Sequence, residues 1–393
     1  MTAAVPARDR ADACPGALQT HAAADGALAR IRLPGGAVTA EQVQVLAAAA
    51  RELGDGAMEL TSRGNVQLRG LRPGSEPELG NRLAAAGLLP SETHERVRNV
   101  LASPLSGRSG GLLDVRGWVA AFDAGLRADP MLAALPGRFL AALDDGRADV
   151  AGLGADVGLL AVGADDVALL LAGTDSALRT TPREAVDLLL AATRAFVDER
   201  AAQGGSAWRL AELAGGPARV AARVAGRARA AVSPVALPGA PLTGPAGSVP
   251  QDDGRTALIA VVPLGRLTVD QAELLAATCS ELVVTPWRSV VLPDLPDEGV
   301  GACLAAAGLV LDPSSPWLQV TACAGRPGCA RSLADVRADA SAAVAADGLP
   351  ASGVRQHWAG CERRCGRPPG AVVVDVVAIG AGYRIDAPAG AGT

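Results

Sequence analysis

The stretch ALARIRLPGGAVTAEQVQVLAAAAREL, residues 27–53, decides the fold because the chain contains it in two versions. Residues 256–282, TALIAVVPLGRLTVDQAELLAATCSEL, follow the same pattern. In each version a segment with alternating apolar residues precedes a segment with helical periodicity, and Thr39 or Thr268 stands where it can cap that helix. An internal match of this length indicates a duplicated structural unit.

The similarity continues past the helix. The strand-like run MELTSRGNVQLRGL (58–71) corresponds to LVVTPWRSVVLPDL (282–295), and LAAAGLLP (83–90) corresponds to LAAAGLVL (304–311). Each copy is therefore predicted to run strand, turn, helix, strand, turn, strand, helix. The chain carries two copies of a small α+β unit.

The two copies differ in the polarity of one strand. The first copy is polar at Thr61, Ser62, Arg63, Asn65, Gln67 and Arg69. The second has Pro286, Trp287, Ser289 and Val291 at the positions of Ser62, Arg63, Asn65 and Gln67. We expect only the first strand to face a polar ligand; the alternative is an exposed edge strand.

The rest of the chain separates into segments with their own patterns. A helix is predicted at 117–136 with a break at Pro130, strands at 138–145, 157–163 and 167–173, and a helix at 181–204 with Pro182 at its first position. Residues 233–254 are rich in Pro and Gly, as linkers are. The predicted order is a leader (1–25), the first repeat (26–92), an α/β domain (95–232), the linker (233–254), the second repeat (255–312) and a cysteine-containing domain (316–385).

The composition and the net charge of the chain argue against some classes of function. The 393 residues carry a formal net charge of −5 and no lysine, which argues against general nucleic-acid binding. No run of apolar residues is long enough to cross a membrane, and the first residues lack the apolar run of a signal peptide. We therefore expect a cytoplasmic protein without membrane or nucleic-acid partners, in which cysteines stay reduced.

Four of the seven cysteines lie close together in the sequence. Cys323 and Cys329 form a C-x5-C pair, and Cys361 and Cys365 form a C-x3-C pair. Structural zinc usually takes C-x2-C pairs, so these spacings suit it poorly. Unrelated buried cysteines are a second explanation. A [4Fe–4S] cluster, which needs four thiolates held by loops, is the third, and the surrounding glycines and prolines favour it.

These motifs together resemble the sulfite and nitrite reductase family. The C-x5-C and C-x3-C pairs resemble its cluster signature, LTSRGNVQLRG (60–70) its T-x-R-x-x-x-Q strand, and RNVLASPLSG (98–107) its R-N-[VI] segment. The resemblance extends over roughly residues 14–380 in the family's order. It implies an α+β fold with two ferredoxin-like half-repeats, each followed by an α/β domain of the nitrite/sulfite reductase type.

The resemblance also implies functional residues. In the family's siroheme reductases an oxyanion on the haem iron lies among two arginines and two lysines. Arg63 and Arg98 match the arginines, and Arg138 in LPGRFLAAL (135–143) matches the first lysine. Leu140 replaces the second lysine, which puts reduction of a small dianion in doubt because leucine carries no charge.

Three further stretches resemble the precorrin-3B synthases, the oxygen-using branch of this family. They are CPGALQTHAAADGALARIRLPGG (14–36), ERVRNVLASPLSG (95–107) and LPGRFLAALDDG (135–146). This resemblance implies a monooxygenase that hydroxylates C20 of precorrin-3A with O2 and forms a γ-lactone in cobalamin synthesis. It implies a [4Fe–4S] cluster on Cys323, Cys329, Cys361 and Cys365, and an additional iron centre in place of siroheme.

The substrate of such an enzyme carries many carboxylates, which arginine binds bidentately. The predicted substrate-binding residues are Arg63, Asn65, Gln67, Arg69, Arg98 and Arg138. Cys365 is the candidate bridge to the second iron, and His357 is either an iron ligand or a packing residue. The electron donor, NADH through a reductase or a ferredoxin, stays open. A siroheme-dependent nitrite or sulfite reductase and a non-catalytic iron–sulfur or zinc scaffold are the alternatives.

Overall fold

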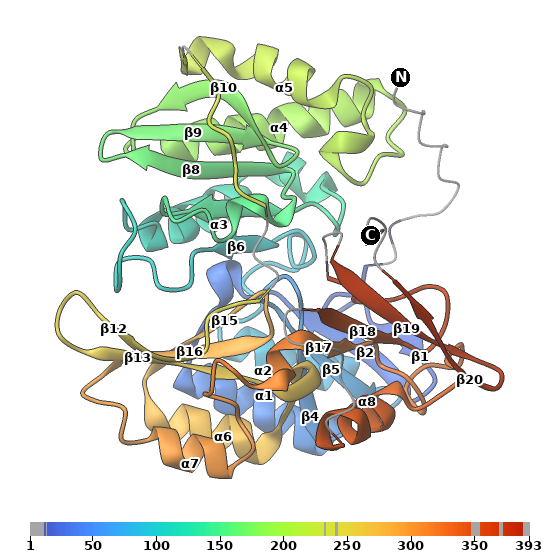
Figure 1. Ribbon diagram of the computed structural model, residues 1–393. Coiled ribbons are helices and arrows are strands. Elements are labelled where there is room, and N and C mark those ends of the chain that lie inside the picture. The colour runs from blue at the N-terminus through green and yellow to red at the C-terminus, as the bar shows by residue number, and fades with distance from the viewer. Residues whose placement is uncertain are drawn as a thin grey trace. The chain divides into compact units, whose positions relative to one another are not determined.

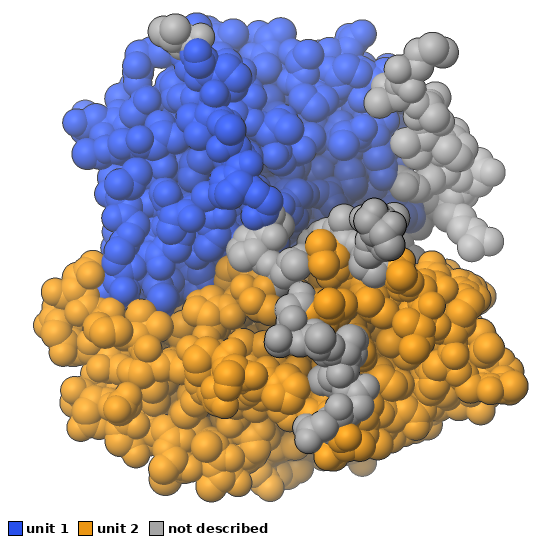
Figure 2. All heavy atoms as spheres, in the orientation of Figure 1, with its two compact units in different colours: residues 1–16, 32–36, 89–241 blue, residues 17–31, 37–88, 242–393 orange. Residues whose placement is uncertain are grey.

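The computed structural model describes residues 12, 14–231, 233–239, 243–346, 354–368 and 372–387. The chain divides into two compact units, which Figure 2 shows in different colours. Unit 1 comprises residues 1–16, 32–36 and 89–241, and unit 2 comprises residues 17–31, 37–88 and 242–393. The second half-repeat, most of the first and all four clustered cysteines belong to unit 2.

Each half-repeat forms a five-stranded sheet, and the two sheets exchange one strand. The first has the order β1-β2-β5-β4-β14 and the second β12-β13-β16-β15-β3. Strand β14 of the second repeat pairs with β4 of the first, and β3 of the first pairs with β15 of the second. The strands are β1 (His21–Ala23), β2 (Gly26–Ile31), β3 (Ala37–Thr39), β4 (Ala57–Leu60), β5 (Val66–Leu71), β12 (Gly247–Pro250), β13 (Thr256–Val261), β14 (Arg266–Thr268), β15 (Glu281–Val284) and β16 (Ser289–Leu295).

The repeat helices begin at the predicted threonines. Thr39 and Thr268 each accept a hydrogen bond from the amide of a glutamine, Gln42 or Gln271, whose side chain bonds back to the threonine amide. These reciprocal bonds satisfy amides that a helix start otherwise leaves open. The helices are α1 (Ala40–Leu53), α2 (Glu76–Ala85), α6 (Val269–Thr278) and α7 (Gly301–Ala306), and they lie on one side of the two sheets (Figure 1).

The cysteine segment adds a smaller sheet to unit 2. Its order is β17-β18-β19-β20, and the first three strands are parallel. The strands are β17 (Val320–Ala322), β18 (Arg355–Ala359), β19 (Val373–Ile379) and β20 (Gly382–Asp386). Helix α8 (Val336–Ala345) packs its buried Ala340 and Val344 against Val320. A parallel pair of strands requires such a crossover helix.

Unit 1 is a six-stranded sheet covered by helices. Its order is β11-β10-β9-β8-β7-β6. The rings of Phe139 and Phe196 stack at 5.0 Å in its core, and Phe122 is fully buried beside them. The elements are β6 (Val100–Ala102), β7 (Ala141–Asp144), β8 (Val157–Gly163), β9 (Asp166–Leu171), β10 (Thr174–Thr180), β11 (Arg229–Ala230), α3 (Arg116–Ala128), α4 (Ala185–Ala202) and α5 (Gly216–Val224).

Two local predictions need adjustment. The long helix begins at Ala185, not at Pro182, because residues 182–184 form a turn before it. The end of the Pro/Gly-rich segment forms strand β12, whose backbone pairs with β13. The predicted break at Pro130 is confirmed, since α3 ends at Ala128 and a 3₁₀ helix follows. Within the described residues, no helix has the length and apolar character needed to span a membrane.

Candidate functional site

The two cysteine pairs follow adjacent parallel strands. Cys323 comes directly after β17, and Cys361 comes shortly after the end of β18. The two strands are paired in register, with Ala322 opposite Trp358. Because the carboxyl ends of parallel strands meet at one edge of a sheet, both cysteine loops start from the same edge. The fold therefore brings together two loops that are distant in the sequence.

Backbone hydrogen bonds join the loops. The amide of Cys323 donates to the carbonyl oxygen of Trp358 at 3.0 Å, and the amide of Leu333 donates to that of Gly360 at 2.8 Å. The Gly360 amide donates to Sγ of Cys323 at 3.2 Å. A Cβ on Gly360 would lie 1.9 Å from Oγ of Ser332, so glycine is required at this point. An amide of one loop thus already solvates a thiol of the other, as amides do around cluster sulfurs.

The four thiols also interact electrostatically. The pKa of Cys365 is raised, first by partial burial and then by Cys323 and Cys361, with a smaller contribution from Cys329. Arg363 opposes this shift. The other three cysteines are therefore close enough to Cys365 to disfavour its thiolate, and a bound metal would have to drive the deprotonation of Cys365. In the part of the chain that the structure describes, no three Cys, His, Asp or Glu side chains are arranged around a point that could hold a metal ion.

The donor set fits a cluster by chemical type. Four thiols on two glycine-containing loops, with an amide directed at one sulfur, are what a cubane cluster requires. The ligands of a cubane bind different iron atoms at its corners, so they need not converge on one point as the ligands of a zinc ion do.

The polar positions of the first repeat lie in a turn and along β5. Arg63 is half-buried in the turn between β4 and β5, whereas Asn65 is fully buried. Oγ1 of Thr61 accepts the amide of Arg63 at 3.3 Å and that of Asn65 at 3.1 Å. These bonds fix the backbone that carries Arg63. Of the predicted residues in this turn, only Arg63 presents a partly exposed charge.

Gln67 bonds within its own sheet. Its side-chain oxygen accepts from Nε of Arg30 at 2.8 Å, and its amide donates to Glu59 at 3.2 Å. Both partners stand opposite Gln67 on the neighbouring strands. The side chain therefore helps to hold three strands in register.

Arg69 holds the cysteine loop instead of standing open to solvent. It is 7% exposed and donates two bonds to Asp25 at 3.1 Å. The same guanidinium donates at 2.6 Å to the carbonyl oxygen of Gly328. Gly328 lies between Cys323 and Cys329 in the sequence. Glu59, at 3.7 Å from Arg69, also pairs with Arg337 of helix α8. The sequence did not indicate Asp25, Glu59 or Arg337 as partners because they are distant along the chain.

The remaining predicted substrate residues belong to unit 1. Arg98 is 6% exposed and makes two bonds to Asp123, at 2.6 and 3.1 Å, so its charge is neutralised. Arg138 is exposed and lies over the ring of Trp208 at 5.2 Å. Leu140 is buried in the core, and its amide donates to Asp156 at 2.8 Å.

His357 lies on the strand that leads to the second cysteine pair. It is fully buried on β18, and its Nδ1 lies 3.0 Å from Oγ1 of Thr321. Burial, and then the charges of Arg288 and Arg367, lower its pKa to about 3, so the ring is neutral. Its Nε2 has no hydrogen-bond partner among the described residues.

A cleft of about 570 Å³ lies beside the first cysteine loop. Pro327 and Gly328 of that loop form part of its wall, as do Arg69, Arg266 and Asp335. The cleft thus gives solvent access to one side of the cysteine loop.

Comparison with known proteins agrees with this architecture. The family description "Nitrite/Sulfite reductase ferredoxin-like half domain" matches residues 21–86 and 249–309, which are the two repeats. The solved structure of the Mycobacterium tuberculosis NirA protein superposes with a TM-score of 0.72, at 22% identity, over 87% of this chain and 69% of that one. At this identity the likeness concerns the fold.

Two curated relatives differ in how much of the chain they match. A ferredoxin–nitrite reductase of Synechococcus elongatus is 28% identical over 408 residues, covering 91% of this chain and 77% of the relative. A precorrin-3B synthase of a Sinorhizobium species is 39% identical over 83 residues, covering 21% of this chain and 18% of the relative. The chain therefore contains two copies of the nitrite/sulfite reductase ferredoxin-like half domain and shares its fold with NirA over most of its length.

Proposed function

We propose that the chain is an iron–sulfur monooxygenase of the precorrin-3B synthase type, which hydroxylates C20 of precorrin-3A with O2 and forms the γ-lactone. The observation that carries the proposal is that unit 1 lacks part of the positive charge that the resemblance assigns to an oxyanion site. Of the positions that the resemblance assigns to a small oxyanion, Leu140 is apolar and buried, and Arg98 is neutralised by Asp123. A small dianion such as sulfite depends on several positive charges around it, whereas nitrite carries one charge and is less affected.

A polycarboxylate makes a different demand. Its carboxylates are spread over a large periphery, so single arginines suffice at separate points. Arg63, on a turn held rigidly by Thr61, and Arg138, exposed above Trp208, can each bind one carboxylate. The 39% identity to a precorrin-3B synthase over part of the chain supports the same substrate class.

Cys323, Cys329, Cys361 and Cys365 would hold a [4Fe–4S] cluster, with Cys365 as the candidate bridge to an additional iron. When bound, these iron centres would supply single electrons and activate dioxygen. The residues of the chain itself would solvate a cluster sulfur through the Gly360 amide and position the first loop through Arg69. The electron donor is a ferredoxin or an NADH-dependent reductase.

A siroheme-dependent nitrite reductase is the second candidate. A ferredoxin–nitrite reductase matches 91% of this chain, far more than the precorrin-3B synthase does. In that case siroheme would replace the additional iron, and ferredoxin would be the donor.

Anaerobic purification followed by iron analysis, visible spectroscopy and EPR of the reduced protein separates the candidates. The proposal predicts about four or slightly more irons per chain, a reduced-cluster EPR signal, no siroheme absorption and O2-dependent consumption of precorrin-3A. Siroheme bands with reduction of nitrite would replace it by the second candidate. Zinc without redox-active iron would exclude both candidates and leave the scaffold.

A further inference from the structure

The turn of the second half-repeat copies the turn that carries Arg63. Oγ1 of Thr285 accepts the amides of Trp287 and Ser289 at 3.3 Å each, as Oγ1 of Thr61 does in the first copy. Gly64 has a φ of 62° there, and Arg288, at the same position, has a φ of 61°. Residues other than glycine avoid this left-handed region. An arginine kept in this conformation, where the other copy has glycine, is a candidate for a function.

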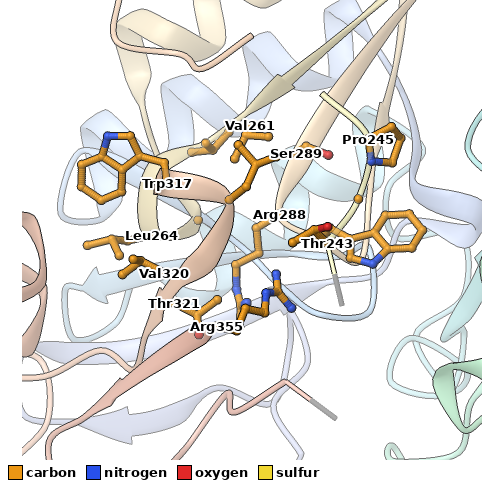
Figure 3. A pocket seen from close by; sticks show the side chains of 15 residues that line it. Thr243, Pro245, Val261, Leu264, Arg288, Ser289, Trp317, Val320, Thr321 and Arg355 are labelled. Atoms are coloured by element: carbon orange, nitrogen blue, oxygen red, sulfur yellow. The ribbon is translucent and has the colours of Figure 1, made fainter. Parts of the chain in front are cut away.

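The side chain of Arg288 enters a small cavity in unit 2. The cavity measures about 20 Å³, and Arg288 and Arg355 line it side by side (Figure 3). Gly265 leaves room for Arg288, since a Cβ there would lie 2.5 Å from Cδ of Arg288. The other walls combine apolar side chains, among them Val261, Leu264 and Trp317, with Ser289 and Thr321. We call this cavity the Arg288–Arg355 pocket.

The two guanidinium groups lack acidic partners. Arg355 is 7% exposed, and its Nε has no hydrogen-bond partner. Arg288 donates to the carbonyl oxygen of Gly366 at 3.1 Å, and within the described residues no carboxylate pairs with either arginine. Burial lowers the pKa of Arg288 to about 10, and burial together with the charge of Arg288 lowers the pKa of Arg355 to about 10. Glu59 exerts an opposing influence on Arg288 but pairs with Arg337.

A buried and a half-buried positive charge, Arg355 and Arg288, without counter-charges favour an anionic ligand. A cavity of about 20 Å³ has room for one small group, not for a macrocycle. Its apolar side chains suit the carbon chain of an organic acid, and its two guanidinium groups suit the acid's carboxylate.

We propose that the Arg288–Arg355 pocket binds a single organic carboxylate group. The group belongs either to a small free acid or to the carboxylate arm of a larger ligand. The two arginines are not among the residues assigned to the proposed oxygenase reaction, although Arg288 donates to Gly366, which follows Cys365. The inference does not depend on that function.

Isothermal titration of the full-length, anaerobically purified protein with sodium propionate, at constant ionic strength against chloride, tests the site. A porphyrin octacarboxylate, followed by its absorbance, is the second probe. The variants are Arg355→Gln and Arg288→Gly, of which the second restores the residue that the first repeat carries. Arg255→Gln, an exposed arginine paired with Asp253, is the matched control.

We expect saturable binding of at least one probe to the wild type and the control, weakened about tenfold or more in both variants. Binding of propionate identifies a free acid as the source of the carboxylate. Binding of the porphyrin alone, with the same dependence on Arg355, identifies an arm of a larger ligand. Equal binding by wild type and both folded variants, or no binding of either probe, overturns the proposal. O2-dependent turnover is not a readout here, so failure of the site and failure of the oxygenase function are distinguishable.

Discussion

The guanidinium of Arg69 donates to the carbonyl oxygen of Gly328 at 2.6 Å. This bond joins strand β5 of the first half-repeat to the loop that carries Cys323 and Cys329. Asp25 and Glu59 neutralise the guanidinium, which is buried. The polar strand that the sequence assigns to substrate binding therefore also positions the cysteine loop.

Arg69→Gln should destabilise unit 2. The substitution leaves the half-buried Asp25 without its cation. Breaking a buried pair typically costs about 3–5 kcal/mol, and the partial exposure of Asp25 places the loss at the lower end. Urea unfolding measures the loss, and iron content reports on the cysteine loop. Arg51→Gln, in the exposed pair with Glu273, is the control and should cost less than about 1 kcal/mol. Equal effects of the two substitutions would contradict the role given to Arg69.

Serine in place of any one of the four clustered cysteines should remove the reduced-cluster EPR signal, because serine is a poor ligand for cluster iron. The clearest case is Cys365→Ser, since Cys365 is also the candidate bridge. Cys303→Ser is the matched control, because Cys303 is exposed on α7 and outside the loops. An unchanged signal in Cys365→Ser would refute the ligand assignment.

Arg63→Gln should raise the KM for a polycarboxylate tetrapyrrole about tenfold to a hundredfold, because a charge-assisted hydrogen bond contributes about 1.5–3 kcal/mol. The fold should be retained, since Arg63 is half-buried and the hydrogen bonds to Thr61 come from the backbone. Steady-state kinetics measure the change, with the exposed Arg72→Gln as control. A KM equal to that of the wild type would remove Arg63 from the substrate residues.

Asp149 should make the stability of unit 1 depend on pH. Burial, and then the charge of Asp144, raise its pKa to about 7, although Oγ of Ser103 donates to it at 2.6 Å. An unfolded aspartate titrates near pH 3.9. Between about pH 4 and 7 the folded state therefore binds more protons, and the free energy of unfolding falls as pH rises.

Asp149→Asn should abolish this fall. As pH rises across that window, the free energy of unfolding of the variant should increase relative to that of the wild type by up to about 1.4 kcal/mol per pH unit. Denaturant unfolding at several pH values gives the difference. Asp253→Asn, an exposed aspartate paired with Arg255, provides the control. A difference between Asp149→Asn and wild type that stays constant with pH would show that Asp149 titrates normally.

The sequence predicted the architecture well where local patterns decide it. The capping threonines Thr39 and Thr268 start their helices as expected, because a side-chain cap is a local interaction. The exchange of β3 and β14 between the two sheets was not predicted, since it depends on pairing between segments that are distant in the chain. The predicted start of the long helix at Pro182 was wrong, because proline fits a turn as well as it fits the first turn of a helix.

The candidate site was predictable in its residue types but not in its partners. The cysteine spacing identified two loops, and the parallel pairing of β17 and β18 brings them to one edge. The arginines were harder to interpret, because an arginine that binds a ligand and one that pairs with an acid look alike in sequence. Arg98 proved to be paired with Asp123. The sequence did contain a sign that Arg288 is unusual, because the alignment of the two repeats places it opposite Gly64.

Turnover of precorrin-3A under oxygen-18 gas by the reduced, anaerobically purified protein tests the central claim most directly. A monooxygenase places one atom of dioxygen in the organic product and releases the other as water, with two electrons from the donor. Mass spectrometry should therefore find one oxygen-18 atom in the tetrapyrrole product, from a protein without siroheme absorption. An unlabelled tetrapyrrole, together with siroheme bands and reduction of nitrite, would contradict the account.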